Sequence, residues 1–273
     1  MDKLAWRVAG VTDRGLSRRD NQDNYYVSAD ERLFVVADGM GGVKGGAEAS
    51  RLAVAAVESL WKEKPPKLSD HALIQDWLQE AVENANEAVC QAADAIAAEA
   101  RMGTTIVVVV QSDEDRAHIA HVGDSRAYLM KDGEINTLTH DHSVVYEMMR
   151  KEKLTLEQCW VSPFRNLLTR CLGHDREVVI DKTEVELSEG AWIVLCTDGL
   201  CGVLRDEQIT SVMTECKTAE EVCSKLVAST IEAGAPDNVT IIAVQYGPDS
   251  VDGAKVTEPA CATAEEAGAE RSS

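Results

Sequence analysis

The stretch Leu33-Phe34-Val35-Val36-Ala37-Asp38-Gly39-Met40-Gly41-Gly42 carries the strongest structural signal in the chain. Its first four residues are apolar and predict a buried strand, which ends at Asp38-Gly39. The glycine run continues to Gly46 and leads into apolar residues that recur every three or four positions from Ala49 to Trp61, which predicts an amphipathic helix. The run has neither the Walker nor the dinucleotide-binding spacing. We therefore expect its glycines to allow close approach of the backbone, with a carbonyl free to face a metal ion.

Strand and helix signals on either side of this stretch occur in blocks. A second amphipathic helix is predicted over 74–96, with Ser69 as its N-cap. Shorter helices are predicted over 143–150 and 154–159 and after the N-caps Asp206 and Thr218, the second with a capping box to Glu221. Strands are predicted at 8–11, 25–27, 104–110, 117–122, 126–130, 134–138, 178–180, 183–187, 191–196 and 239–244. The pattern favours an α+β fold: a four-layer αββα sandwich of two antiparallel sheets flanked by helix pairs.

The composition restricts the classes of protein that the chain can belong to. With 27 Lys and Arg against 47 Asp and Glu, the net charge is −20, which argues against a nucleic-acid binder but not against a cation site. No uninterrupted apolar run, such as 106–110, is long enough to span a membrane, and the first residues lack a signal-peptide pattern. Eight cysteines without a C-x-x-C pair fit reduced thiols, so we expect a cytoplasmic protein.

A change of composition near residue 246 predicts two segments. Residues 1–246 are expected to form one folded domain. Residues 247–273 contain no aromatic residue, are rich in Ala, Glu, Thr, Gly and Ser, and carry six acidic against two basic residues. Such a segment cannot bury enough apolar surface to offset its loss of entropy on folding, so we expect an acidic, disordered tail.

Five aspartates occur where predicted strands begin or end. Asp38, Asp124 and Asp198 follow apolar strand residues, whereas Asp23 and Asp237 precede strands. If these strand ends share one edge of the fold, the carboxylates repel one another unless a cation lies between them. Ligands that are all oxygen favour Mg²⁺ or Mn²⁺. The alternative at each position is an ordinary aspartate in a turn.

Three other patterns suggest chemistry that we consider less well supported. Cys159 and Arg165 have the C-x₅-R spacing of cysteine phosphatases, but the intervening residues include proline and no glycine to cradle a phosphate. Gly123-Asp124-Ser125 is similar to a serine-esterase motif but lacks a matching downstream pair of Asp and His. His140-Asp141-His142 could ligate zinc, although a turn in which Asp141 caps the next helix is favoured.

Taken together, the motifs resemble those of the metal-dependent serine/threonine protein phosphatases (protein phosphatase type 2C, PPM). The resemblance runs from about Trp6 to Tyr246. The bacterial single-domain branch is the most similar, including cyanobacterial members that act on the P-II signalling protein. The matching blocks, in the order of the family, are Thr12-Asp13-Arg14-Gly15 with Arg18 and Asn21-Gln22-Asp23, Val36-Ala37-Asp38-Gly39-Met40-Gly41-Gly42, Met102-Gly103-Thr104-Thr105, His121-Val122-Gly123-Asp124-Ser125-Arg126, Leu138-Thr139-His140-Asp141-His142-Ser143, Arg170-Cys171-Leu172-Gly173, Cys196-Thr197-Asp198-Gly199-Leu200 and Asp237-Asn238-Val239-Thr240.

The resemblance implies a β-sandwich flanked by helices and a centre of Mn²⁺ or Mg²⁺ ions. Asp38 would bridge two core ions, with the carbonyl of Gly39 on the second ion. Asp198 and Asp237 would bind the first. Asp124, together with Asp198, would hold a third, weaker ion.

The resemblance also assigns the surroundings of the ions. Arg18 would bind the phosphate and is, with Asp38, the expected catalytic residue. Asp23, Gln22 and Asn238 would support the ligands and their waters, and residues 146–170 would form a variable flap. Gln22 stands where the family often has Glu, which leaves its effect on the second ion open.

The implied activity is hydrolysis of phosphoserine and phosphothreonine in proteins. A hydroxide that bridges the two ions would attack phosphorus directly, without a covalent intermediate. Met40 stands where eukaryotic members carry a histidine, so the general acid is not identified. The expected partners are phosphorylated proteins, such as a P-II-like protein or kinase substrates, and not nucleic acid or membranes, and the chain is expected to be a monomer. The alternative is a catalytically weak member that acts as a binding or signalling module.

Overall fold

The structure, a computed structural model, describes residues 5–95 and 102–247. Of the predicted tail it describes only Gly247, the last residue of the final strand, and the rest lies outside the described residues. In chain order the elements are β1 (Ala5–Asp13), β2 (Asp23–Val27), β3 (Leu33–Met40), α1 (Gly42–Glu63), α2 (His71–Ala95), β4 (Gly103–Thr104), β5 (Ile106–Gln111), β6 (Arg116–Val122), β7 (Arg126–Lys131), β8 (Glu134–Thr137), α3 (Val144–Arg150), α4 (Leu156–Val161), β9 (Asp181–Glu186), β10 (Trp192–Cys196), α5 (Asp198–Cys201), α6 (Asp206–Thr214), α7 (Ala219–Glu232) and β11 (Val239–Gly247).

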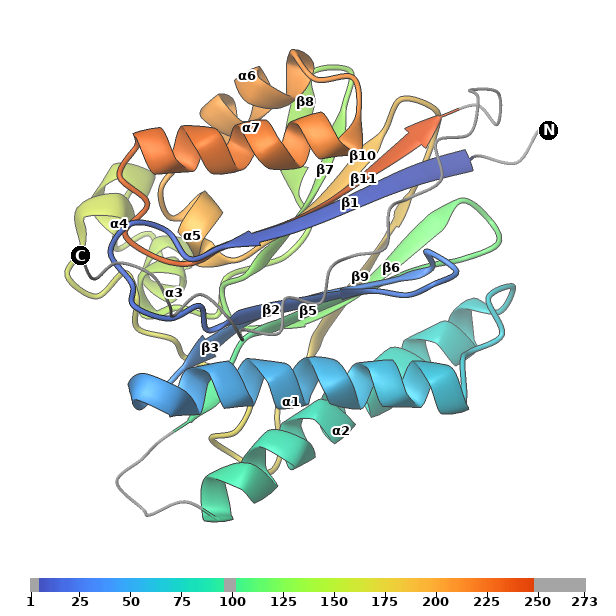
Figure 1. Ribbon diagram of the computed structural model, residues 1–273, viewed down its shortest axis with the longest axis horizontal. Coiled ribbons are helices and arrows are strands. Elements are labelled where there is room, and N and C mark those ends of the chain that lie inside the picture. Colours follow the sequence, from blue (N-terminus) through green and yellow to red (C-terminus); the bar gives the residue numbers. More distant parts are fainter. Residues whose placement is uncertain (1–4, 96–101, 248–273) are drawn as a thin grey trace, which may run out of the picture.

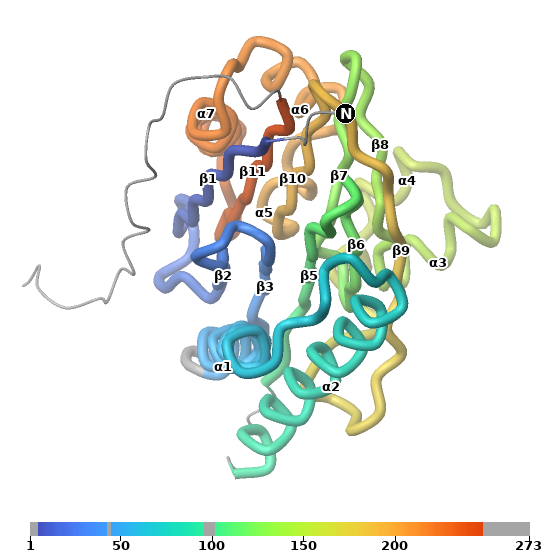
Figure 2. Tube along the Cα trace, turned by 90° about the vertical axis from the view of Figure 1, so that its right-hand side faces the viewer, coloured from blue at the N-terminus to red at the C-terminus, as the bar shows by residue number. Residues whose placement is uncertain are grey.

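Two sheets lie face to face between layers of helices (Figure 1). Within the described residues the first sheet has the order β1-β11-β10-β7-β8. The second has the order β2-β3-β5-β6-β9, with β4 paired to the end of β3. Every strand pair is antiparallel. Helices α1 and α2 cover the second sheet, and α7 covers the outer face of the first (Figures 1 and 2). The predicted αββα sandwich is therefore confirmed.

Strand β3 shows how the sequence produces these layers. Leu33, Val35 and Ala37 are fully buried against α1 and α2, while Phe34 and Val36 are fully buried between the two sheets. Successive side chains of a strand point to opposite faces, and here both faces are covered. This is why the segment is apolar at every position instead of alternating with polar residues.

Two of the predicted helix starts are displaced by one residue. Helix α2 is capped by Asp70, not by Ser69: its Oδ1 accepts from the backbone N–H groups of Ala72 and Leu73 at 3.1 and 3.2 Å. Helix α6 starts at Asp206 itself, after Arg205 as N-cap. Both errors arise because adjacent polar residues have similar intrinsic preferences for a cap, and packing of the helix decides between them.

The predicted cap of α7 is confirmed only in part. The Thr218 side chain accepts from the backbone N–H of Glu221. The Glu221 carboxylate, however, accepts from the backbone N–H of Lys217 at 2.7 Å, one residue before the N-cap. The reciprocal bond of a capping box is therefore not made.

Some strand predictions were also wrong. Residues 178–180 form no strand, and their apolar Val178 and Ile180 instead pack against the core under α1 and α2. The segment 104–110 divides at Thr105 into β4 and β5. Strand β3 runs past Asp38 to Met40, because Gly39 and Met40 pair with β4. The apolar residues of 178–180 have the pattern of a strand, and no local signal distinguishes a paired strand from a buried segment without pairing.

None of the described helices has the length and apolar character needed to cross a membrane.

Candidate metal centre

The five aspartates converge at one end of the sandwich, as their positions in the sequence predicted. Asp38 lies opposite Asp23 in the register of β2 and β3. Asp124 follows β6 of the same sheet. Asp198 begins α5 directly after β10, and Asp237 precedes β11, so these two come from the other sheet. The centre is therefore assembled from both sheets.

The carboxyl groups are close enough to perturb one another strongly. Burial raises the pKa of Asp38 well above its ordinary value, and the negative charges of Asp23, Asp198 and Asp124 raise it further. Burial and the negative charge of Asp198 also raise the pKa of Asp124 well above its ordinary value. Without a cation, part of this group must carry protons to relieve the repulsion.

Two buried carboxylate oxygens of the centre have no hydrogen-bond partner among the described residues: Oδ1 of Asp23 and Oδ1 of Asp198. The other oxygen of Asp23 is held firmly, since it accepts from the hydroxyls of Thr197 at 2.8 Å and Thr240 at 2.7 Å. Burial raises the pKa of Asp23 to about 7 despite these two bonds. Unpaired buried oxygens are rare, and a donor set made only of oxygen suits Mg²⁺ or Mn²⁺. The residues present therefore fit a centre of divalent ions.

Glycine is required at position 39 by the packing of the backbone. A Cβ at Gly39 would lie 2.0 Å from the carbonyl oxygen of Gly46 and 2.7 Å from that of Gln22. The Gly39 N–H donates to the latter oxygen at 3.1 Å. The expectation that this run allows close approach of the backbone is confirmed. The run itself is not a loop throughout, because α1 begins within it at Gly42.

Asn238 fixes the turn between β1 and β2 beside the aspartates. Its Oδ1 accepts from the backbone N–H of Gln22 at 2.9 Å, and its Nδ2 donates to the carbonyls of Arg14 and Asp20 at 2.9 and 3.0 Å. This turn also carries Arg18. The Gln22 side chain donates from its Nε2 to the carbonyl of Gly42 at 3.0 Å.

Arg18 is the candidate cation of the centre. Its Nη2 donates to Oδ2 of Asp237 at 2.5 Å, and half of the Arg18 side chain (51%) is exposed to solvent. The guanidinium therefore lies at the mouth of the centre, with donors free to bind an anion beside the carboxylates.

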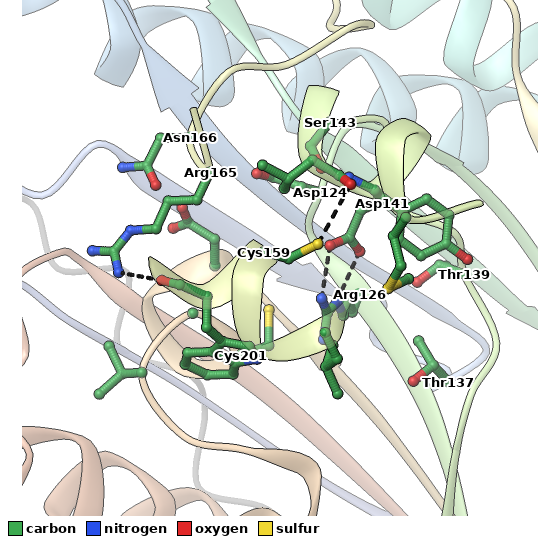
Figure 3. Close-up of a pocket in the computed structure, with 18 of the residues that line it drawn as sticks. Asp124, Arg126, Thr137, Thr139, Asp141, Ser143, Cys159, Arg165, Asn166 and Cys201 are labelled. Carbon is green, nitrogen blue, oxygen red and sulfur yellow. Dashed lines mark hydrogen bonds and ion pairs between the residues drawn. The ribbon is translucent and has the colours of Figure 1, made fainter. Parts of the chain in front are cut away.

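A cavity of about 360 Å³ opens next to Asp124, Asp198 and Asp237. Residues of α3 and α4 in the predicted flap also line it, among them Tyr146 and Trp160, and Figure 3 shows Cys159 of α4 among the lining side chains. The cavity gives a solute a path from solvent to the aspartates.

One wall of the cavity contains an ion pair that sequence analysis did not predict. Nε and Nη2 of Arg126 donate to the two oxygens of Asp141, both at 2.7 Å (Figure 3). Asp141 was predicted to cap the following helix, which was wrong, since Ser143 caps α3. Arg126 precedes Asp141 by 15 residues, so no local signal could have shown the pair.

The alternative nucleophiles are engaged elsewhere. Burial raises the pKa of the Cys159 thiol, whose Sγ donates to the carbonyl of Val145 at 3.5 Å. Arg165 donates to the Trp160 carbonyl and not into a phosphate cradle. The Ser125 hydroxyl is buried and bonds to the Thr105 hydroxyl at 2.7 Å.

His142 holds the turn that presents Asp124. Its backbone N–H donates to the Gly123 carbonyl at 2.9 Å, and its ring Nδ1 accepts from the Gly123 N–H at 3.1 Å. Gly123 has a φ of +110°, which side chains rarely adopt, and a Cβ there would strike Thr105. His142 thus clamps a turn that only glycine can form.

The burial of His142 predicts a dependence of stability on pH. Burial, with the nearby positive charges of His121 and Arg170, lowers the pKa of His142 to about 4. The folded chain therefore leaves this ring neutral at pH values where the unfolded chain protonates it. The resulting stability is complete above pH 6.5 and is lost as the pH falls towards 4. Between pH 7 and pH 5 the loss should be on the order of 2 kcal/mol for such a shift.

Urea unfolding at pH 7 and pH 5 tests this, with His142→Asn as the comparison. Asparagine can still accept from the Gly123 N–H but does not titrate, so its stability should fall less between the two pH values. The difference between the two proteins removes the contributions of all other groups. Equal losses in both proteins would contradict the assignment.

The comparisons with known proteins agree with this geometry. The model of the family described as Protein phosphatase 2C matches residues 12–230. The serine/threonine phosphatase Stp of Listeria innocua is 32% identical over 237 residues, which cover 86% of this chain and 93% of that protein. The structure of the S. agalactiae serine/threonine phosphatase has a TM-score of 0.82 at 32% identity and covers 88% of this chain and 99% of its own. A second similar structure is the catalytic domain of the phosphatase PstP in complex with two manganese ions. Its TM-score is 0.78 at 32% sequence identity, and the match covers 89% of this chain and 99% of the PstP domain. The chain therefore belongs to the protein phosphatase 2C family.

Proposed function

We propose that this protein is a metal-dependent phosphatase that hydrolyses phosphoserine and phosphothreonine in other proteins. The observation that carries the proposal is the group of buried aspartates from two sheets, with unpaired oxygens on Asp23 and Asp198, beside a cavity that opens to solvent. Membership of the family and the likeness to a phosphatase domain that holds two manganese ions support it.

The residues have distinct proposed roles. Asp38 would be shared by two ions, with the Gly39 carbonyl on one of them and Asp198 and Asp237 on the other. Asp124 would hold a third ion together with Asp198. When bound, the ions supply the charge that lowers the pKa of water and stabilises the phosphoryl oxygens.

The other side chains orient this centre and its substrate. Asp23, itself held by two threonine hydroxyls, would accept from waters of the centre. Asn238 and Gln22 keep the β1–β2 turn in place, and the turn positions Arg18 to bind two phosphoryl oxygens. No side-chain nucleophile is needed.

Removal of divalent ions tests the proposal directly. Full-length protein treated with EDTA should lose hydrolysis of p-nitrophenyl phosphate, and Mn²⁺ or Mg²⁺ should restore it. A cysteine phosphatase would resist EDTA and be stopped by thiol alkylation, whereas a binding module of this fold would stay inactive with either ion. Full activity in EDTA would overturn the mechanism.

The substrates are proposed more broadly. The relatives are named serine/threonine phosphatases, so phosphorylated proteins of signalling pathways are the expected class, and a P-II-like protein is one candidate on the resemblance of the motifs. The described cysteines are all free thiols, which supports a cytoplasmic location. A monomeric enzyme is proposed as well. Phosphoproteomics of a deletion strain would identify the substrates as the phosphoproteins that accumulate.

We also propose that the catalytic unit ends with β11. Strand β11 extends to Gly247, which pairs with Ala5, so a shortened chain should keep this residue. Truncation after Gly247 should leave turnover of p-nitrophenyl phosphate within about threefold, because a segment with the composition of 248–273 is not expected to add apolar surface to the core. A marked fall in melting temperature would show that residues 248–273 belong to the folded unit.

A further inference from the structure

We propose a second metal site, specific for zinc or a similar transition metal, formed by His71, His118 and Glu184 away from the aspartate centre. His71 is the first residue of α2, His118 lies in β6, and Glu184 lies in β9 directly opposite His118. One ligand atom from each of the three residues lies within 4.8 Å of the other two. Figure 2 shows the start of α2 beside β6 and β9.

The ring nitrogens already face one another at a distance close to what a metal requires. Nδ1 of His71 and Nε2 of His118 are 3.0 Å apart. Two imidazole nitrogens bound to one tetrahedral zinc ion, each about 2.05 Å from it, lie roughly 3.3 Å apart. The separation of the two nitrogens would therefore change by only about a few tenths of an ångström when an ion replaces the shared proton, and both rings would turn so that their lone pairs meet at the ion.

The remaining contacts supply what a bound histidine needs on its other nitrogen. Nε2 of His71 lies 2.8 Å from Oε2 of Glu114, and a metal-bound ring commonly donates to a carboxylate in this way. Nδ1 of His118 lies 3.1 Å from the side-chain amide of Gln75, which can turn its oxygen to accept the proton. His118 would thus move its proton from Nε2 to Nδ1 on binding the ion, and no proton need leave the ring.

Glu184 would become the third ligand by a rotation of its side chain. Arg116 binds its Oε1 at 2.9 Å, and its Oε2 lies 3.4 Å from Nδ1 of His118, so the carboxylate must turn from this nitrogen towards the ion at Nε2; the side chain is 43% exposed, which leaves room for the turn. The His118 ring is completely buried, and burial lowers its pKa, so the ring is neutral and offers the lone pair of Nε2 once the proton has moved to Nδ1. Two imidazoles and a carboxylate favour Zn²⁺ or Co²⁺ over Mg²⁺. The two centres should therefore select different metals.

A second cluster, His121 with His142 and Asp181, is a poorer site although both of its rings are buried. Nδ1 of His142 accepts from the Gly123 N–H, so in the neutral ring Nε2 carries the proton. Nε2 is the nitrogen that lies 3.3 Å from Asp181, and it therefore has no lone pair to give to a metal. In the cluster of His71 and His118, the group on Nδ1 of His118 is the Gln75 amide, which can turn to accept a proton as a backbone N–H cannot.

Zinc binding by the full chain tests the proposal. Equilibrium dialysis in excess Mg²⁺ should find one more Zn²⁺ bound to the wild type than to His71→Ala. The matched control is His174→Ala, which removes an exposed histidine outside the cluster and should bind as the wild type does. Glu114→Gln should weaken zinc binding at the extra site by about 10- to 100-fold, as loss of a carboxylate bound to a metal-ligating histidine does.

Thermal unfolding provides a second measurement. The melting temperature of the wild type should rise by roughly 5–10 °C with Zn²⁺ at 100 times its Kd, and that of His71→Ala should rise less.

The outcomes separate the proposal from other binding modes. Hydrolysis of p-nitrophenyl phosphate with Mg²⁺ by His71→Ala at the wild-type rate would show that the variant folds. Equal zinc stoichiometry in wild type and His71→Ala would overturn the site. Loss of the extra zinc ion in His174→Ala to the same extent as in His71→Ala would also overturn it. With Co²⁺, an extra thiolate charge-transfer band would place the ion on cysteine and also refute the assignment.

Discussion

Replacing Asp38 by asparagine is expected to lower kcat/KM by at least about 1000-fold, the largest effect of any single substitution in the centre. Asp38 is the proposed shared ligand of both core ions, so its loss removes charge and geometry from both. Phosphatase assays with saturating Mn²⁺ measure this. Retention of a tenth of the activity would contradict the shared role.

The same variant should unfold at an equal or higher temperature than the metal-free wild type at pH 7. The pKa of Asp38 is raised by burial and neighbouring charge, so the metal-free wild-type chain loses stability as the pH rises above the pKa of an unfolded aspartate. Asparagine mimics the protonated carboxyl without this cost. The gain in melting temperature that Mn²⁺ gives the wild type should shrink. Asp132→Asn, at an exposed Asp-Gly turn between β7 and β8, is the matched control and should change neither property.

Arg18→Ala should lower kcat/KM by about 10- to 150-fold, since a charge-assisted hydrogen bond contributes about 1.5–3 kcal/mol. Arg18→Lys should recover little of this, because an ammonium group cannot hold two phosphoryl oxygens in the geometry of a guanidinium. Kinetics on a phosphopeptide provide the measurement. Arg19→Ala, which removes an exposed neighbouring guanidinium, should be nearly silent.

A titration with Mn²⁺ separates two roles for Arg18. Its guanidinium contacts Asp237, so its loss could act by misplacing a proposed ligand. In that case higher Mn²⁺ would restore the rate. If Arg18 binds the phosphate, the deficit persists at saturating Mn²⁺. Identical behaviour of the Arg18 and Arg19 variants would rule out the assignment and leave the enzyme class intact.

The sequence predicted the layers of the fold because these depend on local pattern. The continuous apolar run of β3 and the helical spacing after it follow from burial on both faces of a strand and on one face of a helix. The convergence of the aspartates was also predictable in outline, since each stands where a strand signal begins or ends. Their roles as ligands remain predictions.

What could not be predicted depends on contacts between distant residues. Asp141 has the local pattern of a helix cap but is bound by Arg126 across the cavity wall. Residues 178–180 have the composition of a strand but pack without pairing. His71 and His118 look like isolated histidines in the sequence, 47 residues apart, and only the packing of α2 on β6 brings their rings together.

The assembly of the proposed centre from both sheets would link the lifetime of the protein to its supply of metal. Asp38 belongs to one sheet, and Asp198 and Asp237 follow or precede strands of the other, so ions held by these proposed ligands would join the two halves of the sandwich. An ion that binds only the folded chain stabilises it by about 1.4 kcal/mol for each tenfold excess over its Kd. A cell short of manganese and magnesium would therefore hold phosphatase molecules that are both idle and easier for proteases to open. Metal scarcity would then reduce the amount of enzyme as well as its turnover. The rate of dephosphorylation in the cell would therefore fall more steeply with the metal concentration than the fraction of occupied centres does.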